Sequence, residues 1–358
     1  MYQINYGIIY NGLTAAERTL ASALWRNRLF LFIVGLHMLT GAVICSIFHI
    51  PFWSPLIENL ITILNKILNF TIVCATGFMV WRFIYAMFRV RPKKPIHWMV
   101  SDIRTYLSRY VRLVDGTICF VALAALANTF TLLKNLVSNF VPFSWDPTFA
   151  ELDRILHGGV DVWTLLWPVF GYPFITTMIN VAYHFWFVLI YAMAFVAAYD
   201  RRDPERGMTY LVAFALTFII GGNVLATLFS SVGPVYFEEF GFGDTFTEQL
   251  LKLEMLNEIS PVWALSVHDL LLTNYNTEGM IRGISAMPSM HVASSVLMAL
   301  FAFRYSRWLG WAFTVFAVVI QIGSVHLAWH YAVDGYLGAL VALVCWYVAQ
   351  FLSKKSSI

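Results

Sequence analysis

The sequence predicts an all-α protein, a polytopic membrane bundle of about eight transmembrane helices. Of its 358 residues, 59% are hydrophobic and only 12% are charged, whereas an average soluble domain has roughly 25% charged residues. Several apolar runs approach the roughly 20 residues that cross about 30 Å of hydrocarbon. This composition excludes a soluble globular enzyme. The net charge of +3, without a basic cluster among stacking aromatics, argues against a nucleic-acid partner.

Eight apolar runs define the expected helices. The runs cover 29–50, 67–88, 114–133, 174–198, 208–229, 289–303, 309–329 and 333–353. The second and third are less uniform, because Asn65 and Lys66 precede one and Asp115 opens the other. We expect residues 1–113 to hold an N-terminal cytoplasmic segment, two transmembrane helices and a basic interfacial segment. Residues 114–358 should form a helical bundle with an outward-facing site.

Lys and Arg residues gather at alternate ends of these helices, as the positive-inside rule requires. One side of the membrane holds all but five of the 23 cations. The five on the other side are Lys66, Lys134, Arg154, Lys252 and Arg282. We therefore expect both termini in the cytoplasm, and the segments 134–173 and 230–288 on the outer face.

Two segments between the apolar runs have a surface character. Segment 89–113 alternates bulky apolar residues with Arg104, Arg109 and Arg112. This pattern fits an interfacial helix on anionic lipid as well as a solvated loop, and both remain open. Segment 146–158 begins with Asp-Pro, a helix-start signal. It places Phe149, Leu152, Ile155 and Leu156 on one face, which predicts an amphipathic helix at the outer surface.

Ionisable residues at membrane depth are costly and mark candidate functional sites. Segment 282–291 reads Arg-Gly-Ile-Ser-Ala-Met-Pro-Ser-Met-His and brings Ser285, Ser289 and His291 to the outer end of the sixth predicted helix. At the outer end of the seventh predicted helix the chain carries His326, His330 and Asp334. One segment enters a helix and the other leaves one at the same membrane face. We therefore expect them to share a pocket.

A metal site is the alternative use of the second segment. The spacing His326-x-x-x-His330-x-x-x-Asp334 would put three potential ligands on one helical face. No second cluster with ligand spacing lies in the other apolar runs, which favours a site without metal or cofactor. The four cysteines lie inside apolar runs without a C-x-x-C spacing. They indicate neither a disulfide framework nor a zinc ribbon.

Two motifs resemble those of a known family. Pro288-Ser289-Met290-His291 is similar to the P-S-G-H element of the type 2 phosphatidic acid phosphatase superfamily, and His330-x-x-x-Asp334 matches its final H-x-x-x-D element. The sequences S-A-M-P-S-M-H and H-Y-x-V-D-G resemble those of the branch that contains inositol phosphorylceramide synthases and their bacterial relatives. The resemblance runs from Ser230 onward. It implies a core six-helix, lipid-phosphatase-like bundle in a bacterial inner (plasma) membrane.

The resemblance also implies a mechanism and roles for the residues of the two motifs. His330 would attack phosphorus and form a phosphohistidine, and Asp334 would fix the tautomer of its ring. His291 would protonate the leaving oxygen and then activate the acceptor. Ser289 would donate a hydrogen bond to a phosphoryl oxygen, with Ser285 as a further phosphate contact.

The chain departs from the family where the family carries cations. The first element, a Lys followed by Arg-Pro, is absent, and the corresponding segment runs from Ser230 to Tyr236. Gly323-Ser324 stands where the family usually has Ser-Arg. Arg282 and the hydroxyl of Tyr236 remain as candidate phosphate contacts. Ser324, His326, His184 and Asn180 are candidates to line the site.

Fewer cations favour a singly charged phosphodiester over a doubly charged monoester. The sequence therefore predicts a lipid phosphotransferase that acts on a phosphodiester lipid head group, with a lipid phosphoester as donor and a lipid or water as acceptor. A phosphatase of phosphatidate or polyprenyl phosphate remains an alternative. A non-enzymatic transporter or scaffold is a further one.

Overall fold

The computed structural model describes residues 15–107, 110–200, 203–277 and 283–356. Within these ranges every regular element is a helix and no strand occurs, which confirms the predicted all-α class. The chain forms two compact units. The first comprises residues 1–128 with 198–202, and the second comprises residues 129–197 with 203–358.

The first unit contains long helices separated by short turns. They are α2 (Ala15–Arg26), α3 (Arg28–Ile47), α4 (Trp53–Tyr85), α5 (Pro95–Leu107) and most of α6 (Tyr110–Asn135), with a π-helical turn at Ala86–Val90. The predicted run 67–88 is therefore the second part of a longer helix. Segment 89–113, for which the sequence leaves helix and loop open, is helical over 95–107. Arg109 and the side chain of Arg112 lie outside the described residues.

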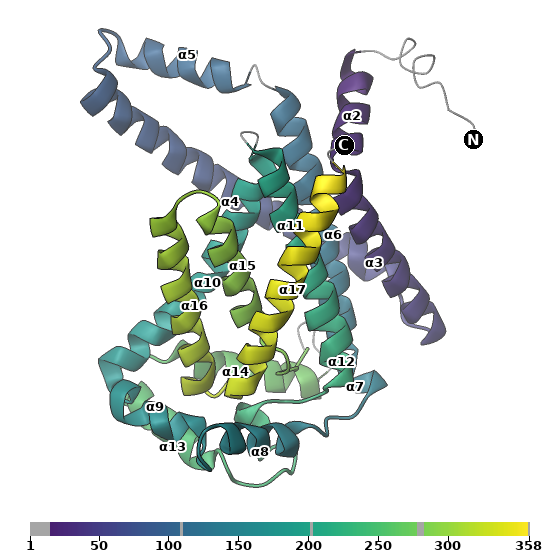
Figure 1. Ribbon diagram of the computed structural model, residues 1–358, viewed down its shortest axis with the longest axis vertical. Coiled ribbons are helices and arrows are strands. Elements are labelled where there is room, and N and C mark those ends of the chain that lie inside the picture. Colours follow the sequence, from purple (N-terminus) through teal and green to yellow (C-terminus); the bar gives the residue numbers. More distant parts are fainter. Residues whose placement is uncertain (1–14, 108–109, 201–202, 278–282, 357–358) are drawn as a thin grey trace. The chain divides into compact units, whose positions relative to one another are not determined.

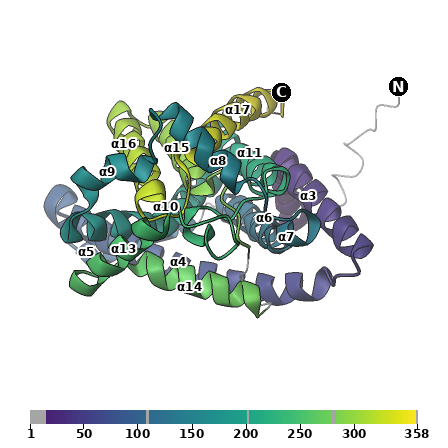
Figure 2. The ribbon, with the colours of Figure 1, turned by 90° about the horizontal axis from the view of Figure 1, so that it is seen from below.

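The second unit contains the remaining helices. They are α7 (Val137–Phe140), α8 (Asp146–Leu156), α9 (Val162–Phe170), α10 (Pro173–Tyr199), α11 (Pro204–Ile219), α12 (Ala226–Leu228), α13 (Thr247–Ile259), α14 (Trp263–Asn276), α15 (Met290–Phe303), α16 (Arg307–His326) and α17 (Ala332–Ser356). Helix α15 packs against α16 and α17, and α11 packs against α17. The short helices α8 and α9 lie at the end of this bundle where α16 leads into α17, with α13 beside them (Figures 1 and 2).

Six helices in the described part of the chain are long and apolar enough to cross a membrane. They span Arg28–Ile47, Leu113–Asn135, Pro173–Tyr199, Glu205–Leu228, Arg307–His326 and Ala332–Lys355. The sequence predicts eight such runs. The run 67–88 lies within α4, and the run 289–303 coincides with α15, a shorter apolar helix of 14 residues. The six spans identify an integral membrane protein.

The amphipathic helix predicted at 146–158 is present as α8. Leu152, Ile155 and Leu156 are exposed on the protein surface. The buried face consists of Asp146, Phe149, Ala150 and Asp153. The sequence pattern did not assign the two carboxylates to the buried face. In this helix they are turned inward and satisfied by backbone N–H groups, as described below.

Candidate active site

The two motifs meet at the start of α15 and α17. The backbone N–H of Ser289 donates to the backbone oxygen of Asp334 over 2.9 Å. Gly338, on the first turns of α17, permits this approach, because a Cβ atom there would lie 2.5 Å from the carbonyl oxygen of Ser289. The segments that the sequence places at one membrane face are thus in direct backbone contact.

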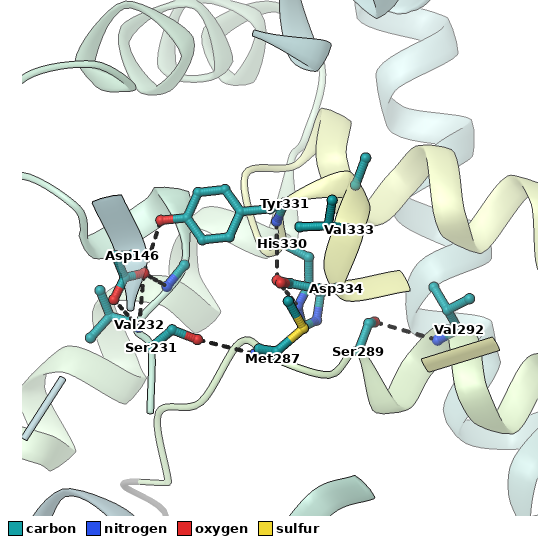
Figure 3. A network of polar contacts seen from close by, with 12 residues as sticks. Asp146, Ser231, Val232, Met287, Ser289, Val292, His330, Tyr331, Val333 and Asp334 are labelled. Atoms are coloured by element: carbon teal, nitrogen blue, oxygen red, sulfur yellow. Dashed lines mark hydrogen bonds and ion pairs between the residues drawn. The ribbon is translucent and has the colours of Figure 1, made fainter. Parts of the chain in front are cut away.

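His330 lies in the connection between α16 and α17, and its ring is held by Asp334. The Nδ1 atom of His330 is 3.1 Å from Oδ2 of Asp334, and the same oxygen accepts from the backbone N–H of Tyr331 (Figure 3). The backbone N–H of His330 donates to the carbonyl of Ser324 over 3.0 Å. Burial and, to a smaller extent, the charge of Lys134 lower the pKa of His330 to about 3. The ring is therefore neutral near pH 7, as a nucleophile requires.

His291 occupies the first turn of α15 and faces His330, with 6.4 Å between the two ring centroids. Two aromatic rings of α10 pack against His291: Tyr183 at 4.5 Å and Trp186 at 4.1 Å between centroids. Trp186 is anchored in turn, because its Nε1–H donates to Oγ of Ser294 over 2.9 Å. The orientation of His291 is thus determined by stacking and leaves its ring beside His330.

Ser289 is the N-cap of α15. Its side chain is fully buried and accepts from the backbone N–H of Val292 at 3.5 Å, a long hydrogen bond (Figure 3). Because Oγ serves as acceptor in this contact, its hydrogen is available to an oxygen of a bound anion. Ser285 is partly buried in the segment that leads to Pro288.

A family comparison gives these motifs their context. A family model described as the PAP2 superfamily matches residues 147–348. The chain belongs to the PAP2 superfamily. This membership supports a lipid phosphatase or phosphotransferase type of function. Neither the curated proteins nor the solved structures contain a significant match to the chain.

Asp146 organises one side of this PAP2 site, although the sequence reading did not assign it. Its buried carboxylate accepts from the backbone N–H groups of Val232 and Gly233 over 2.8 to 3.1 Å. It also accepts from the hydroxyl of Tyr331 over 2.8 Å (Figure 3). Burial raises the pKa of Asp146, and these hydrogen bonds oppose the shift because they stabilise the ionised form. Asp146 thereby links α8 to the residue next to His330.

Asp153 links α8 to the start of α17 in the same way, by accepting hydrogen bonds from backbone N–H groups. Its two carboxylate oxygens accept from the backbone N–H groups of Ala332 at 2.7 Å and Val333 at 2.9 Å. These are orphan donors of the first helical turn, which a carboxylate satisfies well. Burial raises the pKa of Asp153, and the two backbone hydrogen bonds act against that shift. Asp146 and Asp153 are seven residues apart, a spacing of two helical turns that could have revealed their common face.

Several predicted site residues have other partners in the structure. The hydroxyl of Tyr236 donates to the backbone oxygen of His268 over 2.9 Å. Oδ1 of Asn180 accepts from the backbone N–H of Ala264, and Nδ1 of His184 contacts the carbonyl of Asn180. His184 nevertheless lies within electrostatic range of His291. Ser324 is fully buried and contributes its carbonyl to His330, as described above.

His326 points away from His330. Its Nε2 atom contacts Oγ1 of Thr176 at 2.9 Å, and its ring packs against Trp167 and Phe170. The alternative arrangement with three ligands on one helical face is not present, because α16 ends at His326 and the chain turns through Ala328 at φ 62° before α17 begins. Among the described residues no group of three His, Cys, Asp or Glu side chains could hold a metal ion.

The cation that the structure brings near the two histidines differs from the predicted one. Arg282, the predicted phosphate contact, lies outside the described residues. The structure instead brings Lys134, at the end of α6, within electrostatic range of both His291 and His330. No motif marks this lysine. The available signal was its position among the five cations on the predicted outer side.

Proposed function

We propose that this protein is an integral membrane lipid phosphotransferase that acts on a phosphodiester lipid through a phosphohistidine intermediate. The observation that carries the proposal is the pairing of His330 with Asp334 opposite His291, in a chain that belongs to the PAP2 superfamily. This arrangement provides a nucleophile, a group that orients it and a second histidine for proton transfer.

In the first step His330 attacks phosphorus through Nε2, because Asp334 retains the proton on Nδ1. The bond between phosphorus and the leaving oxygen breaks, and His291, which enters this step as the imidazolium, gives one proton to that oxygen and becomes neutral. In the second step His291 takes a proton from the acceptor hydroxyl. The resulting oxygen attacks the phosphohistidine, the P–N bond breaks, and His330 returns to its neutral form.

The residues around the phosphoryl group favour a diester over a monoester. At the position where the family carries cationic phosphate contacts, residues 230–236 of this chain include no charged side chain. Ser230, Ser231 and Tyr236 in this segment are buried. A diester carries one negative charge and a monoester close to two near neutral pH. The members of the family are generally phosphatases, so hydrolysis of a lipid phosphate is the second candidate function. The sequences of the two motifs resemble those of inositol phosphorylceramide synthases, which favours the transferase over the phosphatase.

Reconstituted full-length protein tests the proposal. A phospholipid with an alcohol head group should be consumed in the presence of an acceptor lipid, faster than phosphatidic acid under the same conditions. The His330→Ala protein is the control for contaminating activities. Release of inorganic phosphate from phosphatidic acid or a polyprenyl phosphate, without dependence on an acceptor, would replace the transferase by a phosphatase. Absence of turnover with all lipids, together with gradient-driven transport, would replace it by a carrier.

The proposal includes an outward-facing site and cytoplasmic termini, as the distribution of cations predicts. Cysteines introduced singly by Glu248→Cys and Asp269→Cys, in a background without the native cysteines, should react with an impermeant thiol reagent applied to intact cells. Those introduced by Asp203→Cys and Ser306→Cys should react only after permeabilisation. The reverse pattern would place the chemistry in the cytoplasm.

A further inference from the structure

Lys134 is a cation without a counter-ion in the described part of the second unit. It lies in the last turn of α6 and is partly buried. Its Nζ atom is 5.8 Å from the ring centroid of Phe130. No carboxylate of the described residues lies within ion-pair distance of it, whereas Lys252, another lysine of the same unit, pairs with Glu248 at 2.7 Å. An ammonium removed from water without a partner is costly, so this position suits an anionic ligand.

The packing around Lys134 leads directly to the catalytic motifs. A Cβ atom on Gly283 would lie 2.9 Å from Cγ of Lys134, so the lysine stem rests on the segment that continues to His291. The ring of Phe130, beneath the ammonium, packs on Gly222, where an added Cβ would also lie 3.4 Å from Sδ of Met290. Lys134 thus lies against the segment before Pro288, and Phe130 and Gly222 connect it to Met290 after that turn.

The charge of Lys134 acts on both histidines of the site. A phosphoryl group between the rings of His330 and His291, which are 6.4 Å apart between centroids, would therefore lie in the field of this ammonium. The same charge helps to keep His330 neutral before the substrate arrives, as an attacking nitrogen requires. An incoming phosphoryl anion then neutralises the lysine at the moment when the nucleophile is needed.

We infer that Lys134 is the phosphate-binding cation of this site and that it bonds a non-bridging oxygen of a singly charged phosphodiester. This inference rests on the proposed function and adds a residue to it. The lysine comes from α6, a helix upstream of the family match at 147–348, and not from the segments where the family motifs end. One ammonium matches one negative charge, which makes the diester the preferred ligand class.

Equilibrium binding of orthovanadate, an anion that imitates phosphorus in the transition state, tests this role without turnover. With the purified full-length protein, Lys134→Gln should raise the dissociation constant of vanadate about tenfold or more, as expected for the loss of a charge-assisted hydrogen bond. Lys134→Arg should restore most of the affinity. Lys252→Gln, the matched control, should bind vanadate like the parent protein. In the lipid assay Lys134→Gln should raise KM for the diester.

A second measurement uses the unsubstituted protein and does not depend on the folding of a variant. Acylation of Lys134 by an amine-reactive reagent, quantified by mass spectrometry, should fall when vanadate is present, while acylation of Lys252 should not. Unchanged vanadate affinity in a folded Lys134→Gln protein, or acylation of Lys134 that vanadate does not reduce, would overturn the inference. Normal vanadate results without any lipid turnover would instead refute the proposed function and leave Lys134 as an anion-binding residue.

Discussion

The two units of the chain use buried charge in different ways. In the first unit, arginines meet carboxylates: Arg26 lies 3.0 Å from Asp115, and Arg82 bonds Asp102 with two nitrogens at 2.8 and 2.9 Å. In the second unit, the buried carboxylates of Asp146 and Asp153 accept from backbone N–H groups instead. Paired charges of the first kind hold helices together, and each is already satisfied.

The second arrangement has a different consequence. Because backbone donors occupy the carboxylates of α8, these carboxylates position the His330 connection without competing for a cation. Among the described residues the ammonium of Lys134 has no carboxylate partner. In the proposed function the second unit carries the chemistry, and the variants below test this from the largest expected effect to the smallest.

Removal of the nucleophile should have the largest effect. His330→Ala should abolish both lipid turnover and the trapping of radioactive phosphorus on the protein, because the substitution removes the nitrogen that attacks phosphorus in the proposed mechanism. Asp334→Asn should retain small residual activity, since the amide can still orient the ring in part. His291→Ala should slow the leaving-group step about 10²- to 10⁴-fold. Substantial turnover in His330→Ala would end the phosphohistidine hypothesis.

Loss of the α8 carboxylate that caps α17 should have the next largest effect. Asp153→Ala leaves the N–H groups of Ala332 and Val333 without their acceptor and releases the connection that carries His330. We expect kcat to fall about 10²-fold, as for a misplacement of about 1 Å in a catalytic group. Asp153→Asn should recover much of this loss, because its amide oxygen still accepts one bond.

The rate of phosphoenzyme formation measures this positioning effect. Glu151→Ala, an exposed carboxylate of the same helix, is the control and should behave like the parent protein. If Asp153→Ala forms phosphoenzyme at the parental rate while its thermal stability falls, then the carboxylate is structural and does not position the nucleophile.

A change of pH from 7 to 5 should have a smaller effect on the rate of single-turnover trapping. The pKa of His330 lies at about 3, below its ordinary value of 6.5, so the ring stays neutral between pH 7 and pH 5. Single-turnover trapping should therefore not lose rate over this range through protonation of the nucleophile. The same shift stabilises the folded state above about pH 6.5, and this contribution is lost as the pH falls toward 3. A steep loss of trapping near pH 6 would show that His330 titrates normally.

The smallest effect is expected in the first unit. Arg82→Gln or Asp102→Asn removes an ion pair whose side chains are 17% and 20% exposed. The free energy of unfolding should fall by roughly 1 to 3 kcal/mol, as for the loss of charge-assisted hydrogen bonds that are mostly shielded from solvent. Lipid turnover should not change, which the transfer assay would measure. A large loss of turnover would show that catalysis depends on charges in both units.

The sequence by itself determined those features whose physical cause is local. Apolar runs of sufficient length predict helices because the hydrocarbon of a bilayer offers no partner for free backbone groups. The spacing of His330 and Asp334 predicts their contact because residues four positions apart lie about one helical turn apart. The structure has that contact although the turn begins outside a helix. Six of the eight predicted runs coincide with helices long and apolar enough to cross a membrane in the described part of the chain.

Only the tertiary structure decided which distant groups complete the site. Asp153 meets Ala332 across 179 positions of sequence, and Asp146 meets Tyr331 across 185. The hydrophobic pattern of α8 did not reveal the two buried carboxylates, because hydrophobicity does not register the backbone donors that make a buried carboxylate stable. In the sequence, nothing distinguishes Lys134 from an ordinary lysine at the end of a helix. Its role depends on the approach of Gly283 and on the lack of a carboxylate partner among the residues that the structure describes, which are facts of packing and not of sequence pattern.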